Sequence, residues 1–203
     1  MIETSEDVWQ VVEPLMREST EYSDAGQHEE ALRLADVLLA EHGSELGTQD
    51  QAVMELFRGR ELVSLGRYED GGRAFQRCLK LAREGTPGRP GMAVEALSWL
   101  AYALYKLERL DDAERVLVRI IDRYGHRTDP VTARFVIEAL GNRGKQQERR
   151  GDYTGARASY ASAIELARGS TDADVRDLAR RLRSEQWILR LRTLAPQRWR
   201  SRP

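Results

Sequence analysis

Cysteine and histidine are scarce in this 203-residue chain, and the shortage of each removes a class of function. A single cysteine, Cys78, excludes an internal disulfide framework. The three histidines, His28, His42 and His126, lie far apart with no carboxylate or cysteine at metal-ligand spacing, so we expect no metal site. No apolar run is long enough to cross a bilayer, and the acidic first residues are unlike a secretory signal. These absences favour a cytoplasmic protein.

Patterns that would indicate catalysis are also missing. Cys78 falls on the same helical stripe as Phe75 and Ala82, so we expect an inert core thiol rather than a nucleophile. Acidic pairs such as Asp111-Asp112 stand at expected helix starts, where carboxylates interact favourably with the helix dipole. We therefore predict that the chain is not an enzyme and uses no cofactor.

Charge is distributed unevenly along the chain. Residues 1–100 carry 10 Lys and Arg against 19 Asp and Glu, a net charge of −9, whereas residues 101–203 carry 22 against 14, a net charge of +8. The plain interpretation is a dipolar soluble molecule. The alternative is a homo-oligomer that joins an acidic N-terminal end to a basic C-terminal end, or an acidic partner held at the basic end.

A helix-turn-helix pattern recurs four times. Each copy has a turn residue, a larger residue two positions on, a small contact residue and two further stripe positions at helical spacing. The small residues are separated by 40, 42 and 43 positions, and hairpins of this length must stack to bury their apolar faces. The copies are Gly26, His28, Ala31, Ala35 and Leu38; Gly66, Tyr68, Gly71, Phe75 and Cys78; Glu108, Leu110, Ala113, Leu117 and Ile120; and Gly151, Tyr153, Ala156, Tyr160 and Ala163.

This pattern resembles the tetratricopeptide repeat, although its step exceeds the family's usual length of about 34 residues. The step is closer to the longer repeats of kinesin-light-chain-like and bacterial regulator-type relatives. The resemblance implies an all-α fold, a right-handed α-solenoid of stacked antiparallel helix hairpins. It also implies a protein-binding or peptide-binding scaffold or adaptor without chemistry of its own.

The expected organisation is one domain over residues 1–195, followed by a basic tail at 196–203. The repeats are expected at about 12–43, 48–84, 91–125 and 130–168, with a capping helix at 172–194. Pro14 is predicted to kink or divide the first helix. Thr48 is predicted to begin the next hairpin in a capping box with Gln51, and Asp129 to cap the fourth before Pro130.

A ligand groove is predicted on the first helices of the hairpins. In the third pair Trp99, Tyr102 and Lys106 lie almost opposite the packing stripe, and equivalent spacing selects residues of the second and fourth pairs. Aromatic and cationic lining suits a peptide or helix with apolar and acidic side chains. Trp99 and Tyr102 are equally consistent with packing between repeats. The predicted groove residues are Phe57, Arg60, Trp99, Tyr102, Lys106, Asn142, Lys145 and Arg149.

Nucleic-acid binding is the competing interpretation. Nine arginines lie between Arg176 and Arg202, with Trp187 and Trp199 among them. Such a segment can contact phosphates and stack on bases. The arginines surround the expected capping helix rather than forming one stripe, which favours the protein-binding scaffold.

Overall fold

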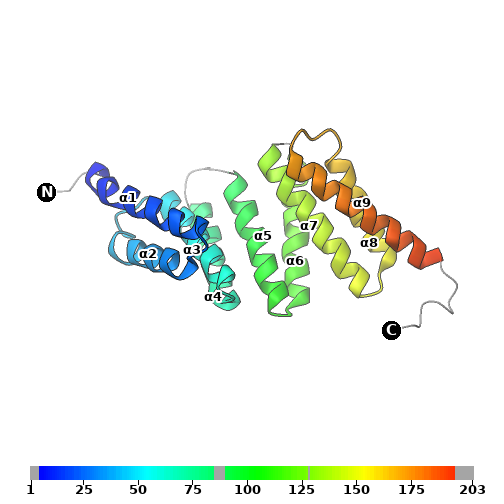
Figure 1. Ribbon diagram of the computed structural model, residues 1–203, viewed down its shortest axis with the longest axis horizontal. Coiled ribbons are helices and arrows are strands. Elements are labelled where there is room, and N and C mark those ends of the chain that lie inside the picture. Colours follow the sequence, from blue (N-terminus) through cyan, green and yellow to red (C-terminus); the bar gives the residue numbers. More distant parts are fainter. Residues whose placement is uncertain (1–4, 85–89, 128, 195–203) are drawn as a thin grey trace. The chain divides into compact units, whose positions relative to one another are not determined.

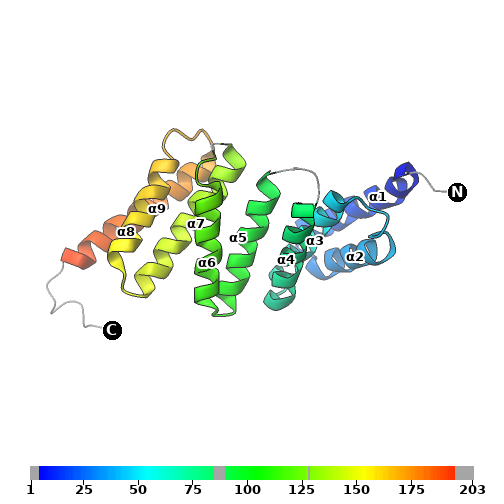
Figure 2. The same cartoon turned by 180° about the vertical axis from the view of Figure 1, so that it is seen from behind.

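The computed structural model of the chain describes residues 5–84, 90–127 and 129–194. In these ranges the chain forms nine α-helices and no strand. Figures 1 and 2 show the helices from two sides. The expected tail at 196–203 lies outside the described residues. The helices are α1 (Ser5–Asp24), α2 (His28–Glu41), α3 (Thr48–Ser64), α4 (Tyr68–Glu84), α5 (Pro90–Lys106), α6 (Leu110–Tyr124), α7 (Pro130–Arg149), α8 (Tyr153–Leu166) and α9 (Ala173–Leu194).

The chain divides into two compact units, residues 1–109 with α1 to α5 and residues 110–203 with α6 to α9. In the first unit α1 packs on α2, α2 on α3, α3 on α4, and α5 on α4 and α3. In the second, α6 packs on α7, α7 on α8, and α9 on α8 and α7. The boundary falls inside the expected third hairpin, at the turn between Arg109 and Leu110. That the whole of 1–195 is one domain stays a prediction.

The four expected turns share one backbone geometry. Gly26, Gly66 and Gly151 have φ of 75°, 75° and 78°, in the left-handed region that glycine enters without a steric penalty. Glu108 occupies the same place in the third copy with φ of 59°, although it carries a side chain. In each turn the next amide closes the helix by donating to a carbonyl five residues earlier. These bonds join Gln27 to Tyr22, Arg67 to Leu62, Arg109 to Leu104 and Asp152 to Gln147, at 2.8–3.0 Å.

The expected stripe residues form the interior of the hairpins. Every small contact residue and stripe position of the four copies is buried. The two large rings, Phe75 and Tyr160, are fully buried and each lies against a glycine of the preceding helix, Gly59 and Gly144. A Cβ atom on either glycine would approach the ring to 3.0 Å or less. Close helix contact in both hairpins therefore depends on a glycine facing an aromatic ring.

Of the helix caps predicted at Asp129 and Thr48, the structure has only the first. Asp129 caps α7 as expected, because its carboxylate accepts the amide of Thr132 at 3.0 Å. The predicted capping box at Thr48 is wrong: Gly47 is the N-cap residue of α3 and no side chain caps it. Gln51 instead donates to the carbonyl oxygens of Gly43 and Leu46, which fixes the preceding loop.

Pro14 does not divide the first helix. It lies inside α1, which is continuous over Ser5–Asp24, and its ring is exposed. The missing proline amide can be tolerated here because the turn that loses its hydrogen bond faces solvent.

Candidate functional site

The residues predicted to line a groove fall in both units. Phe57, Arg60, Trp99, Tyr102 and Lys106 belong to α3 and α5 of the first unit. The others, Asn142, Lys145 and Arg149, belong to α7 of the second.

An aromatic cluster lies between α4 and α5. The Trp99 ring stacks on buried Phe75 with a centroid distance of 6.4 Å and an interplanar angle of 19°. Tyr102 meets Trp99 edge to face at 6.0 Å and meets Tyr68 in the same way at 6.4 Å. Edge-to-face pairs of this kind stabilise their rings beyond the apolar area they bury. Trp99 therefore packs between successive helix hairpins and holds Tyr102 in place.

Tyr102 nevertheless remains open to solvent, with 42% of its surface exposed. The Lys106 ammonium lies 5.5 Å from the Tyr102 ring centroid and 6.0 Å from that of Tyr68. A cation at this distance over a ring is attracted by its π electrons, which orders an otherwise mobile side chain. We call the four residues Tyr68, Trp99, Tyr102 and Lys106 the Tyr102 surface. It combines exposed aromatic area with one positive charge.

Sequence reasoning missed Tyr68 as part of this surface. It was expected only as the aromatic residue after the turn glycine, two positions beyond Gly66. Its contact with Tyr102 joins residues 34 positions apart, and nothing in the local pattern signals it.

Two other predicted residues of the first unit make different contacts. Phe57 packs against the buried cluster that contains Val12, Leu38 and Met54, so it contributes to the packing of α3 on the first hairpin. The Arg60 guanidinium lies 3.7 Å from the Glu95 carboxylate of α5, with both side chains partly exposed. An exposed pair of this kind contributes little to stability, so Arg60 can exchange Glu95 for another carboxylate.

On α7 the predicted residues form an exposed polar stripe. Asn142 and Lys145 are exposed, as is Arg149 one turn further on. The buried side of the same helix carries Gly141, whose added Cβ would lie 3.0 Å from Leu182 of α9, and Gly144, which faces Tyr160. The packing of α7 on α8 and α9 thus orients Asn142 and Lys145 away from the interior.

Cys78 has the environment expected of an inert core thiol. Its side chain is fully buried. Burial, with smaller effects of the Glu55 and Glu95 charges, raises the pKa of the Cys78 thiol to about 12. The reactive thiolate is therefore almost absent near neutral pH.

His28, which follows the first turn, contacts the buried carboxylate of Glu61. Glu61 of α3 is 2% exposed. One of its oxygens accepts the Ser23 hydroxyl at 2.8 Å, and the other lies 2.7 Å from Nδ1 of His28. These bonds tie the first turn to α3. Across the described ranges no group of three or more His, Cys, Asp or Glu side chains could hold a metal ion.

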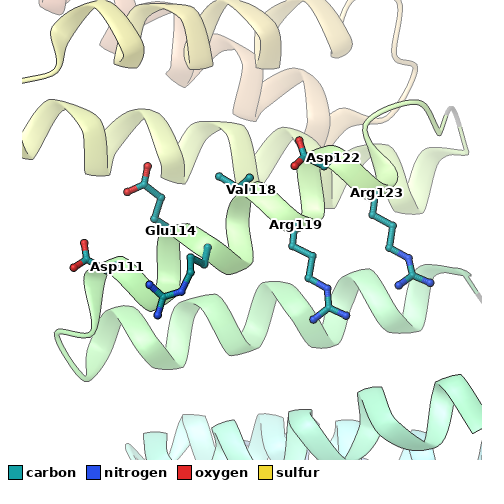
Figure 3. Close-up of a pocket in the computed structure, with 7 residues that line it drawn as sticks. Asp111, Glu114, Val118, Arg119, Asp122 and Arg123 are labelled. Carbon is teal, nitrogen blue, oxygen red and sulfur yellow. The ribbon is translucent and has the colours of Figure 1, made fainter.

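Among the hollows that described residues of the second unit line, two adjoin α6. One, of about 1010 Å³, lies between α6, α7 and α8, with Leu140, Arg143 and Ser159 among its lining residues. The other, of about 830 Å³, lies along α6 and is shown in Figure 3. There Asp111, Glu114 and Asp122 point to one side of the helix, and Arg119 and Arg123 to the other. Arg150 pairs with both Asp111 and Glu114, so these carboxylates serve an ion-pair network.

These features define an all-α helical-repeat protein built from hairpins with closely packed glycine and aromatic contacts. Residues 95–126 match the family model described as tetratricopeptide repeat. This segment, which spans parts of α5 and α6, is therefore similar to a tetratricopeptide repeat, and such repeats generally serve as protein–protein interaction scaffolds.

The fold is similar to that of a solved structure. The structure of MamA AMB-1 is similar over 91% of this chain and 86% of that chain, with a TM-score of 0.55 and 15% sequence identity. The tetratricopeptide repeat domain of P58(IPK) is 18% identical over 91% of this chain, with a TM-score of 0.49, and the aligned part is 48% of that chain. No curated protein matches the sequence. The predicted all-α arrangement of successive helix hairpins is confirmed.

Proposed function

We propose that the chain is a non-catalytic adaptor that binds a peptide or helix of another protein at the Tyr102 surface. The observation that carries this proposal is that Tyr102 is exposed while its ring is held by Trp99 and Tyr68. An exposed aromatic side chain that is already ordered loses little conformational entropy on binding. Rigid aromatic residues of this kind are enriched among those that dominate binding energy.

The charges near Tyr102 indicate the chemistry of the bound segment. Lys106 lies over the Tyr102 ring. Arg60, on α3 of the same unit, pairs with a partly exposed Glu95. An apolar side chain on the Tyr102 ring, with an aspartate or glutamate within one helical turn, would satisfy both the ring and the Lys106 ammonium. The proposed partner is therefore a segment with apolar and acidic residues.

The stripe on α7, in the second unit, is proposed as a separate binding element. The Asn142 amide can both donate to and accept from a ligand main chain, and Lys145 carries a positive charge. Both side chains are exposed on a helix whose other side is fixed by packing. Asn142→Ala is expected to weaken binding without changing the stability of the second unit.

A displayed peptide library selected on the wild-type protein tests the proposal. The selected peptides should combine an apolar residue with nearby Asp or Glu, and Tyr102→Ala should weaken their binding at least about tenfold. Lys106→Glu should shift the selection towards basic peptides. Tyr153→Ala is the matched control, because Tyr153 is 41% exposed but lies on α8. Equal binding by the Tyr102 and Tyr153 variants would refute the assignment.

A further inference from the structure

The last helix, α9, has an exposed apolar stripe on its outer side. Trp187 is 61% exposed, Ile188 38% and Leu191 48%. Leu191 lies at i+4 from Trp187 and at i+3 from Ile188, and residues at these spacings are neighbours on a helix surface, so Leu191 joins the three side chains into one patch. The opposite side of α9 carries buried Val175, Ala179, Leu182 and Leu189, which face α7 and α8.

This stripe is at odds with a terminal cap. The buried side of α9 is as expected of a capping helix, but the outer face of such a helix is normally polar, because no further repeat covers it. Trp187, Ile188 and Leu191 instead present apolar area of the kind that marks an interaction site. The same helix is basic, with six arginines against three Asp and Glu, a net charge of +3.

The first helix, α1, has a complementary outer side. Val11, which is 50% exposed, is followed by exposed Pro14, Glu18 and Glu21 at i+3, i+7 and i+10, so the four share one side of the helix. The apolar pair comes first along α1 and the two carboxylates come second. The whole helix carries six Asp and Glu against one Arg, a net charge of −5.

An antiparallel register brings the apolar parts of the two helices together and places the carboxylates of α1 opposite the arginines of α9. If Val11 of one copy lies on Leu191 of another, Pro14 falls opposite Trp187, and Glu21 falls opposite Arg180. The helical rise makes this possible, since Val11 to Glu21 spans about 15 Å and Arg180 to Leu191 about 16 Å. Arg180 and Arg183 are both exposed, and Arg180 already pairs with Asp177. A parallel register would instead place Glu18 and Glu21 on the apolar end of α9.

We propose that α1 of a second copy of this chain docks antiparallel on the outer side of α9. Apolar contact joins Val11 and Pro14 to Trp187 and Leu191, and ion pairs join the Glu18 and Glu21 side to the Arg180 and Arg183 side. The contact is heterologous, so each copy has one of each surface and association continues beyond a dimer unless a ring closes. The charge distribution suggested a head-to-tail association, and this proposal names α1 and α9 as its two surfaces. It does not use the Tyr102 surface, so variants of α1 and α9 should bind the selected peptides as the wild type does.

Sedimentation velocity of nuclease-treated protein at rising concentration tests the proposal. The wild type should assemble, whereas Trp187→Asp, which disables α9, and the double variant Glu18→Arg and Glu21→Arg, which disables α1, should each stay at the 23.2 kDa monomer mass. Val131→Asp is the control, because Val131 is 58% exposed on α7, outside the proposed contact. It should assemble as the wild type does. Circular dichroism melts confirm that each variant is folded.

Mixing the variants distinguishes head-to-tail contact from other modes. A Trp187→Asp copy keeps α1 and a Glu18→Arg, Glu21→Arg copy keeps α9, so an equimolar mixture should form heterodimers of twice the monomer mass and stop there. Arg180→Glu with Arg183→Glu should restore pairing to the reversed α1. A monomeric wild type at every concentration, assembly by either disabled variant alone, a mixture that does not pair, or assembly that vanishes with removal of nucleic acid would each overturn the proposal.

Discussion

Gly71 and Gly72 are adjacent residues of α4, but a methyl group added to each would meet different surroundings. At Gly71 the added Cβ would lie 2.8 Å from Cγ2 of Val63 and 3.1 Å from the carbonyl oxygen of Gly59, both on α3. The second of these is backbone and cannot rotate away. At Gly72 the nearest atom would be Cδ1 of Leu100, at 3.7 Å, an ordinary van der Waals distance. The two positions therefore form a matched pair.

The two substitutions are expected to change the stability differently. Replacing a glycine by alanine inside a helix stabilises it by about 1 kcal/mol, because alanine loses less conformational entropy on folding. Gly72→Ala should show most of this gain. Gly71→Ala should lose it, because overpacking a close contact typically costs about 1–3 kcal/mol. The Gly72 variant should therefore exceed the Gly71 variant in stability by about 1–3 kcal/mol.

Urea unfolding of both variants, followed by far-ultraviolet circular dichroism, measures this difference. The midpoint should rise for Gly72→Ala and fall or stay unchanged for Gly71→Ala, with the transition slope of the wild type in both. A gain of similar size in both variants would refute the close approach of α3 and α4 at Gly71. A loss at Gly72 would refute the space described next to Leu100.

Two further predictions concern Glu108 and Cys78. Because Glu108 holds a left-handed conformation with φ of 59°, Glu108→Gly should stabilise the fold by about 1 kcal/mol, measured as a rise in melting temperature, whereas Gly66→Glu at the equivalent turn should lower it. Because burial raises the pKa of the Cys78 thiol to about 12, the folded protein at pH 8 should react with Ellman's reagent at least about 100-fold more slowly than the urea-unfolded chain. Equal rates for folded and unfolded protein would contradict a buried, protonated thiol.

The parts of the fold that follow from local chemistry were predictable from the sequence. The turn positions and the buried stripe follow from spacing within one hairpin, which explains why Glu108 was placed correctly in a turn despite lacking the glycine. The helix was correctly expected to start at Thr48, but the capping box there was mispredicted because Gln51 forms hydrogen bonds with the preceding loop instead. The predicted division of the first helix at Pro14 was wrong, because the cost of a proline inside a helix depends on whether the affected turn is exposed.

The candidate site was less predictable, because its contacts join different hairpins. Spacing correctly grouped Trp99, Tyr102 and Lys106 on one helix, since that is a property of the helix alone. It could not show that Trp99 stacks on Phe75, or that Phe57 packs against the buried cluster that contains Val12. These contacts depend on how neighbouring helices are placed, and the helical period of the sequence pattern does not specify that placement.

At Glu61, however, a contact between hairpins is reflected in the residue type at that position. A buried carboxylate is strongly unfavourable unless both oxygens are satisfied, and here Ser23 and His28 from the first hairpin satisfy them. The equivalent position of α7, two residues after the glycine that faces an aromatic ring, is Gln146, which is also buried. Its side-chain oxygen has no hydrogen-bond partner among the described residues. An unpaired buried amide oxygen is less unfavourable than an unpaired buried carboxylate. The position with two partners accordingly holds glutamate, Glu61, and the position whose oxygen has no partner holds glutamine, Gln146.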